Sequence, residues 1–123
     1  MREILFRGKD IKGNWHIGLL AHIGNAWYIS NNAGVATAYE VIPSTIGQYT
    51  GLTDKNGTKI FEGDIVKAIY DSGTFIYKVV FINGIFGLVV KNGGYDCPLV
   101  RWAKNCIEVI GNIHDNPELL KRR

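Results

Sequence analysis

Cysteine is scarce in this chain of 123 residues, which has only Cys97 and Cys106. No Cys-x-x-Cys pair occurs and the three histidines are scattered, so the spacing of a zinc site is missing. The first residues alternate between charged and apolar and do not resemble a secretion signal. We therefore expect two reduced thiols in a cytoplasmic protein, with a disulfide as the alternative, and no metal or cofactor.

Long apolar runs are also missing. None approaches the roughly 20 residues that span a bilayer, so no membrane segment is expected. Charge of one sign is in small excess, because 14 basic and 11 acidic residues leave a net charge of +3. This balance permits contact with nucleic acid but predicts weak, non-specific binding. The motifs Gly-x-x-x-x-Gly-Lys-Ser/Thr, Gly-x-Gly-x-x-Gly, His-Glu-x-x-His and Gly-x-Ser-x-Gly are absent, which argues against enzymes of those classes.

Proline is rare and glycine abundant, three residues against fifteen, while 46% of the chain is hydrophobic. Many short strands joined by tight turns around a real core are therefore expected. The pairs Asn56-Gly57 and Asn83-Gly84 each predict a two-residue turn with positive φ. Residues 65–70, 74–82 and 85–91 are rich in β-branched and aromatic side chains, and they predict a three-stranded antiparallel meander.

Three carboxylates, those of Asp54, Glu62 and Asp64, lie in the stretch with the densest turn chemistry. Gly63 is predicted to adopt positive φ in a tight reversal there. One interpretation is a carboxylate cluster that binds a metal or transfers protons. The other, which we favour, is that these groups accept backbone N–H bonds in turns, where Asp and Gly are common.

Aromatic residues offer a second set of candidate binding groups. Trp27 and Tyr28 are adjacent on a predicted strand and so face opposite sides of a sheet. One of them is expected in the core, whereas the other is available for binding, as exposed rings are in OB-fold and SH3-like barrels. Tyr49, at the start of the turn-rich stretch, is the third aromatic candidate.

The histidines give little support for catalysis. His114 lies beside Asp115 and near Glu108, the one place where a carboxylate is close enough in sequence to orient a histidine base. No nucleophile is placed beside it, so no catalytic residue is assigned. His16 and His22 have no acidic neighbour in the sequence and are expected at the surface or rim.

A resemblance to a known family rests on blocks that occur in order along nearly the whole chain. These blocks are Ile4–Lys9, Gly13–Trp15 with Gly18, Gly47–Gly57, Ile60–Val66, Phe86-Gly87 and Glu108–Leu120. In them the chain resembles the YopX family of phage and prophage proteins. The resemblance implies a mostly β protein with an SH3-like barrel, encoded in Gram-positive phages and prophages, and it implies no known activity or site.

The sequence thus predicts an all-β fold, an SH3-like barrel with an N-terminal β extension and a short C-terminal helix. The extension, residues 1–50, is expected to pack on a barrel core, residues 51–123, as one compact unit. Asn116 is predicted to cap the helix and Pro117 to lie in its first turn. The expected function is a non-enzymatic phage or prophage accessory protein that binds a protein partner or itself as a homo-oligomer. The alternatives are a small nucleic-acid-binding β-barrel and a hydrolase or metal-dependent enzyme using Glu62, Asp64 or the region of His114.

Overall fold

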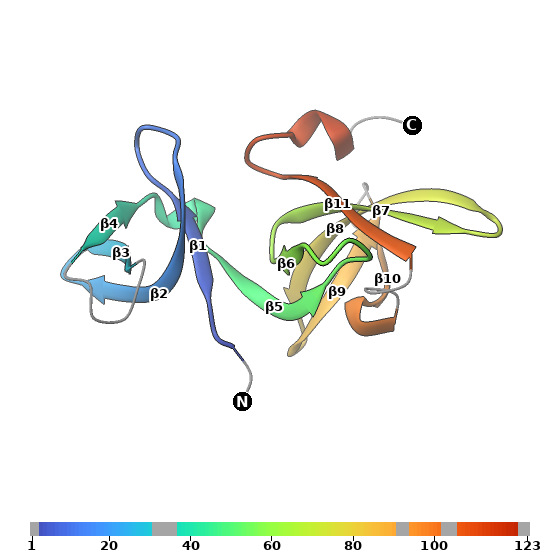
Figure 1. Ribbon diagram of the computed structural model, residues 1–123, viewed down its shortest axis with the longest axis horizontal. Helices are drawn as coiled ribbons and strands as arrows, with labels where there is room; N and C mark the ends of the chain where they lie inside the picture. The colour runs from blue at the N-terminus through green and yellow to red at the C-terminus, as the bar shows by residue number, and fades with distance from the viewer. Residues whose placement is uncertain (1–2, 31–36, 91–93, 102–105, 121–123) are drawn as a thin grey trace. The chain divides into compact units, whose positions relative to one another are not determined.

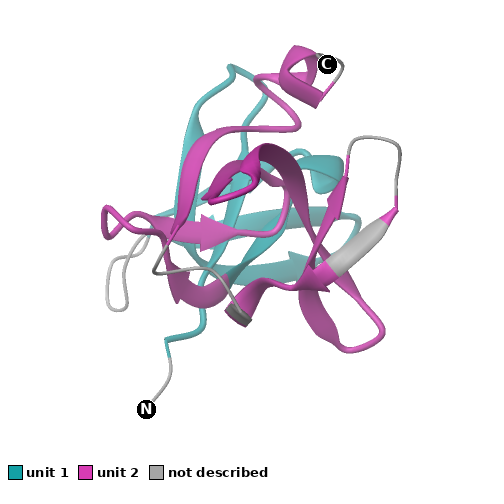
Figure 2. Ribbon diagram, turned by 90° about the vertical axis from the view of Figure 1, so that its right-hand side faces the viewer, with its two compact units in different colours: residues 1–49 teal, residues 50–123 magenta. Residues whose placement is uncertain are grey.

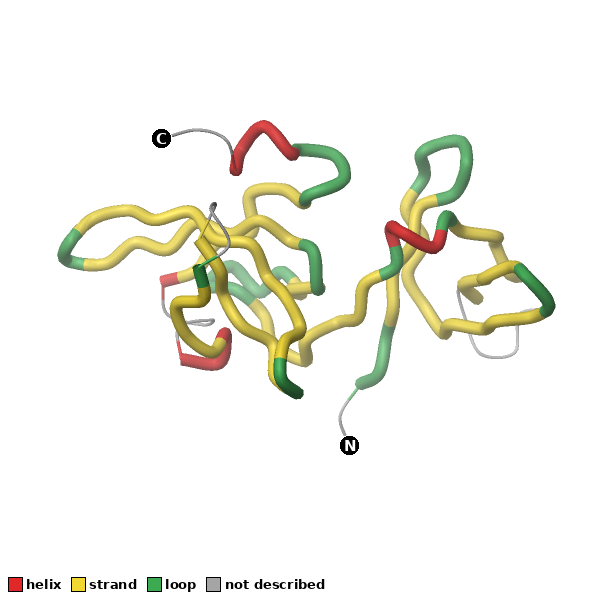
Figure 3. The backbone as a smooth tube through the Cα atoms, turned by 180° about the vertical axis from the view of Figure 1, so that it is seen from behind, coloured by secondary structure: helices red, strands yellow, loops and turns green. Residues whose placement is uncertain are grey.

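Strands dominate the chain, as the backbone tube of this computed structural model shows (Figure 3). The structure describes residues 3–30, 37–90, 94–101 and 106–120, without the side chains of Tyr95, Asp96 and Arg101. The chain divides into two compact units, residues 1–49 and 50–123, coloured separately in Figure 2. Among the described residues, no helix is long and apolar enough to cross a membrane.

Unit 1 is built from antiparallel strands that follow one another in sequence and in space (Figure 1). They are β1 (Phe6–Lys9), β2 (Trp15–Ile23), β3 (Ala26–Ser30), β4 (Ala38–Val41) and the start of β5 (Gly47–Thr53), with the 3-10 turn η1 (Pro43–Thr45) before β5. The strand order β4-β3-β2-β1-β5 follows from hairpin pairing, for example Leu19 with Ser30 and Phe6 with Gly18. The sheet ends with β6 (Lys59–Phe61), which belongs to unit 2.

Hydrogen bonds fold the end of β4 back towards β1. The Ile42 N–H donates to the Lys9 carbonyl at 2.8 Å, and the Lys9 N–H donates to Thr45 Oγ1 at 2.9 Å. Gly8 makes this approach possible, because a Cβ at that position would lie 2.9 Å from the Val41 Cβ. These contacts help to enclose the interior of unit 1, where Ile29 is fully buried.

Unit 2 contains the predicted meander. Its strands are β7 (Asp64–Tyr70), β8 (Gly73–Ile82), β9 (Ile85–Val90), β10 (Tyr95–Pro98) and β11 (Ile107–Asn112), with the 3-10 turns η2 (Leu99–Arg101) and η3 (Pro117–Leu120). They form a five-stranded antiparallel sheet in the order β10-β9-β8-β7-β11. Side chains from one face meet β6 in a core that includes Ile60, Val66, Tyr77, Leu88 and Ile107. Prediction of the meander is confirmed, because β7, β8 and β9 pair in that sequence.

Two of the three predicted turns form as expected. Asn83 and Gly84 have φ of 52° and 84° and connect β8 to β9, and Gly63 has φ of 92°. The prediction for Asn56 is wrong, because in the pair Asn56-Gly57 only Gly57 has positive φ. The Gly57 N–H donates to the Asp54 carbonyl and the Asp54 N–H to the Thr58 carbonyl, which makes a three-residue loop instead of a two-residue one.

The all-β class is confirmed, but the finer description is not. The described strands form two antiparallel sheets and no closed barrel, so the SH3-like barrel is not confirmed. A C-terminal helix is not confirmed either, since Pro117 begins a four-residue 3-10 turn. Asn116 turns its side chain backwards, and its Oδ1 accepts the Asn112 N–H at 3.3 Å. The Asn116 side chain can lie here only because residue 111 is glycine: a Cβ at Gly111 would lie 2.5 Å from Asn116 Oδ1.

The C-terminal segment allows a truncation test. Turn η3 packs against β8, and Leu119 and Leu120 are half-buried there. Removal of residues 121–123, which lie outside the described residues, is expected to leave the melting temperature unchanged. Removal from Asn116 onwards is expected to lower it, because the apolar cover of β8 is lost. Thermal melts followed by circular dichroism decide this, and equal melting of both truncated proteins would contradict the docking of η3.

Candidate functional site

Asp54 ties the turn-rich stretch to the last strand. Its carboxylate is 3% exposed, and Oδ1 accepts the N–H groups of Asn56 and Thr58, both at 2.9 Å. Oδ2 accepts the Val109 N–H of β11, also at 2.9 Å. Three backbone donors thus converge on one carboxylate, which is what a buried charge requires. The geometry gives Asp54 a structural role in unit 2.

Asp64 closes the second reversal in the same way. It is 1% exposed, and its Oδ2 accepts the Phe61 N–H at 2.7 Å. Between them Gly63 donates to the Val79 carbonyl and accepts from the Ile113 N–H, both at 2.9 Å. Glu62 is half-buried in this turn. Two of the three predicted carboxylates therefore bind backbone, each in its own turn, which favours the turn-forming interpretation.

Metal binding finds no support in the part of the chain that the structure describes, where no three His, Cys, Asp or Glu side chains come together as ligands. Nor does the region of His114 form a catalytic arrangement. The Asp115 carboxylate accepts a bond from Asn112 Nδ2 at 3.3 Å, while Glu108 faces Lys67 at 3.7 Å. Both turn residues, His114 and Asp115, donate their backbone N–H to Asn112 Oδ1. This network shapes a tight turn.

The predicted aromatic residues take separate places in unit 1. Trp27 is half-buried and stacks on His22, with ring centroids 4.0 Å apart and an interplanar angle of 2°. Tyr28, also half-buried, faces the other side of the sheet in register with Glu40. Tyr49 is 8% exposed and belongs to the core. The three rings therefore do not form one surface.

His16 has an acidic partner that the sequence did not reveal. Asp10, six residues earlier, places Oδ2 2.8 Å from His16 Nε2 across the β1–β2 turn. Its other oxygen accepts the N–H groups of Lys12 and Asn14. The His16 ring also stacks on Tyr39, with centroids 4.0 Å apart. His16 has no acidic neighbour in the sequence, but it has one in the folded protein, because the hairpin brings Asp10 and His16 together.

This contact predicts a dependence of stability on acid pH. The hydrogen bond from His16, followed by that from the Asn14 N–H, lowers the pKa of Asp10 from 3.8 to about 2. A depressed pKa stabilises the fold fully above the unfolded value, and that contribution disappears as the pH falls from about 4 through about 2. Asp10→Asn is therefore expected to melt below the wild type at pH 5, with the difference closing by pH 2. Asp71→Asn, an exposed carboxylate in the β7–β8 turn, serves as the control, and a constant difference for Asp10→Asn at every pH would contradict the assignment.

The two cysteines are half-buried and neither forms a disulfide. Cys97 lies on the edge strand β10, and Cys106 immediately precedes β11. Burial raises the pKa of the Cys106 thiol, which lowers the fraction of reactive thiolate.

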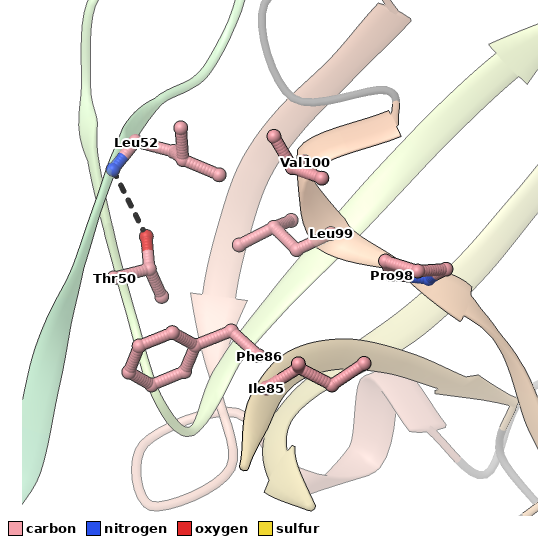
Figure 4. A pocket seen from close by; sticks show the side chains of 7 residues that line it. All are labelled: Thr50, Leu52, Ile85, Phe86, Pro98, Leu99 and Val100. Atoms are coloured by element: carbon pink, nitrogen blue, oxygen red, sulfur yellow. Dashed lines mark hydrogen bonds between the residues drawn. The ribbon is translucent and has the colours of Figure 1, made fainter.

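An apolar pocket in unit 2, which the sequence analysis did not predict, is the candidate functional site. Figure 4 shows its lining by Thr50, Leu52, Ile85, Phe86, Pro98, Leu99 and Val100. The cavity has a volume of about 370 Å³. Its residues come from three segments that are separate in sequence, namely β5, β9 and the continuous stretch of β10 and η2, so no local signal marked them.

The chemistry of this pocket is simple. Among the described residues, no charged side chain lines it, and the hydroxyl of Thr50 donates to the Ile60 carbonyl at 2.8 Å and accepts the Leu52 N–H at 3.2 Å. Leu99 is fully buried at the base, whereas Val100 is 70% and Ile85 43% exposed. Such a lining offers apolar contact and no group for acid–base or metal chemistry.

Comparison with known proteins agrees with this fold. The crystal structure of protein EF1440 from Enterococcus faecalis superimposes with a TM-score of 0.60 at 24% identity, over 98% of this chain and 99% of that one. The SPbeta prophage-derived uncharacterized protein YopX of Bacillus subtilis (strain 168) is 36% identical over 70 residues, 53% of this chain. The match spans about half, 52%, of that relative's length. The YopX protein family model matches residues 18–121, and the chain therefore belongs to the YopX family of prophage proteins.

Proposed function

We propose that this protein is a non-enzymatic prophage accessory protein that binds a protein partner, and that the pocket of unit 2 receives an apolar side chain of that partner. The observation that carries the proposal is a cavity of about 370 Å³ whose described lining is almost entirely apolar: Leu52, Ile85, Phe86, Pro98, Leu99 and Val100, with Thr50. Pockets of roughly 300–1,000 Å³ lined by apolar side chains are typical of binding sites. Catalysis would require titratable groups at the site, and the carboxylates of the turn-rich stretch bind backbone instead.

Exposed apolar residues around the pocket support the proposal further. Phe81 is 53% and Ile82 40% exposed in the strand that leads into the β8–β9 turn, directly before Ile85 on the pocket rim. Contiguous exposed apolar surface marks sites of protein interaction. An SH3-like architecture for unit 2 is part of the proposal, because such barrels bind extended segments on an apolar surface. The cytoplasm is the proposed location, since it keeps thiols such as Cys97 reduced.

Site-specific photocross-linking in the prophage-carrying host tests the proposal. A photoreactive amino acid replaces Val100 on the pocket rim, and in a matched protein it replaces Ile69, which is 45% exposed on β7 and does not line the pocket. We expect one discrete protein adduct from position 100 and none from position 69. An adduct with this chain itself would identify self-association. Equal labelling from both positions, or none from either, would contradict a binding role for the pocket.

A further inference from the structure

Strand β4 is an edge of the sheet in unit 1, and its end at Val41 and Ile42 lies against β1. It ends the sheet order β4-β3-β2-β1-β5-β6, and among the described strands β3 is its one ladder partner. Edge strands are protected by short length, charged side chains (especially lysine), proline or a bulge, because their backbone groups pair readily with another extended chain. The sequence of β4, Ala-Tyr-Glu-Val, contains neither lysine nor proline. This edge is therefore suited to accept a further strand.

A groove of about 340 Å³ lies at the end of this strand. Its lining is Ile11, Glu40, Val41, Ile42 and Pro43. Ile11 is 90% and Ile42 40% exposed, so two large apolar side chains remain largely in water. The turn that carries Ile11 is held in place by Asp10, whose Oδ1 accepts the N–H groups of Lys12 and Asn14. The groove thus has a fixed apolar wall.

Charge defines what the groove fits. Glu40 is the one charged residue among the described residues of its lining, and it is exposed. Its carboxylate makes no ion pair or hydrogen bond with the rest of the described chain. An occupant with a basic side chain would gain a charge-assisted contact there, whereas an acidic one would be repelled.

We propose that unit 1 binds an extended, basic segment of a partner protein by adding it as a strand to β4. One apolar side chain of the segment occupies the groove beside Ile11 and Ile42. A Lys or Arg two residues away lies on the same face of the extended segment and pairs with Glu40. Backbone hydrogen bonds supply affinity, while the groove and the carboxylate supply specificity, as in other cases of strand addition. This site is independent of the pocket in unit 2.

Peptide titrations followed by amide NMR of the full chain test this proposal. The probes are three pools of extended seven-residue peptides with Thr at every second position. In the apolar–basic pool the positions between are apolar and basic residues, and in the acidic pool they are apolar and acidic residues. In the third pool they are Ser and basic residues. We expect the apolar–basic pool to shift the amides of β4 and of the turn around Ile11, with saturation in the millimolar range or below. Shifts confined to the pocket of unit 2, or equal binding of all three pools, would overturn the proposal.

Matched variants sharpen the test. Glu40→Lys is expected to weaken binding of the apolar–basic pool by at least about tenfold and to favour the acidic pool. Ile11→Ser should weaken binding of both the apolar–basic and the acidic pool. Ile17→Ser, at a residue that is 46% exposed on β2 and outside the groove, should bind both pools like the wild type. Amide spectra without peptide confirm that each variant is folded. Unchanged pool preference in a folded Glu40→Lys protein would overturn the proposal.

Discussion

Gly63→Val is expected to destabilise the protein by about 3 kcal/mol, because a β-branched residue at φ of 92° is strained by roughly 1–3 kcal/mol. Two long-range backbone bonds add to this cost. The Gly63 N–H donates to Val79 and its carbonyl accepts from Ile113, so the turn joins β8 to the segment after β11. Any shift that relieves the strain weakens both bonds. Chemical denaturation monitored by tryptophan fluorescence measures the free energy of unfolding directly.

Two further variants separate the cost of backbone strain at positive φ from the cost of weakened hydrogen bonds. Gly84→Val places the same side chain at φ of 84° in an exposed turn, where a Cβ meets nothing within 4 Å, and a smaller loss is expected. Asp64→Asn is expected to cost less than Gly63→Val, because the amide oxygen still accepts the Phe61 N–H. Wild-type stability of Gly63→Val would show that the turn assignment is wrong.

Asp54→Ala is expected to have the other large effect, a loss of about 3–5 kcal/mol. Hydrogen bonds to a charged group contribute roughly 1.5–3 kcal/mol each, and they are not fully additive. Three backbone N–H groups lose their acceptor together, and that of Val109 lies in the β11 ladder. Equilibrium unfolding in urea gives the loss, and the turn from Asp54 to Thr58 should lose protection from hydrogen exchange.

The same variant also tests the rejected metal site. Asp71→Ala, in an exposed turn, should change the unfolding free energy by less than about 0.5 kcal/mol. Addition of Mg²⁺ or Zn²⁺ should not raise the melting temperature of the wild type, since the carboxylate oxygens of Asp54 already accept backbone bonds. Metal-dependent stabilisation that Asp54→Ala abolishes would contradict the structural role of this carboxylate.

Local patterns in the sequence predicted what depends on local physics. β-Branched and aromatic residues favour strands such as β3 and the β7–β9 meander, and Asn83-Gly84 favours a turn because both residues tolerate positive φ. Asn56-Gly57 failed because the same dipeptide also suits a three-residue loop, which the Asp54 carboxylate selects here. The C-terminal helix is not confirmed: Pro117–Leu120 form a 3-10 turn, and the Asn116 side chain accepts the Asn112 N–H.

The site depended on features that a single sequence does not display. The pocket combines Leu52, Phe86 and Leu99 from segments that meet only after the sheet has formed. Likewise, Asp10 and His16 become partners because a hairpin register places them together. Asp54 and Asp64 were identified as candidates from their residue type, but their roles follow from burial and from the backbone donors they meet.

In unit 2, we expect the carboxylates of Asp54 and Asp64 to stabilise the turns and the apolar pocket to bind the partner. The most direct measurement uses the protein that forms the adduct from position 100: its binding at low temperature to wild type, Val100→Asp and Asp64→Asn is quantified by mass spectrometry. We expect Val100→Asp to keep the wild-type melting temperature and to lose the partner, because it adds a charge to the apolar lining formed by the described residues. Asp64→Asn should melt lower and retain the partner while folded. Retention by Val100→Asp together with loss by folded Asp64→Asn would contradict the account.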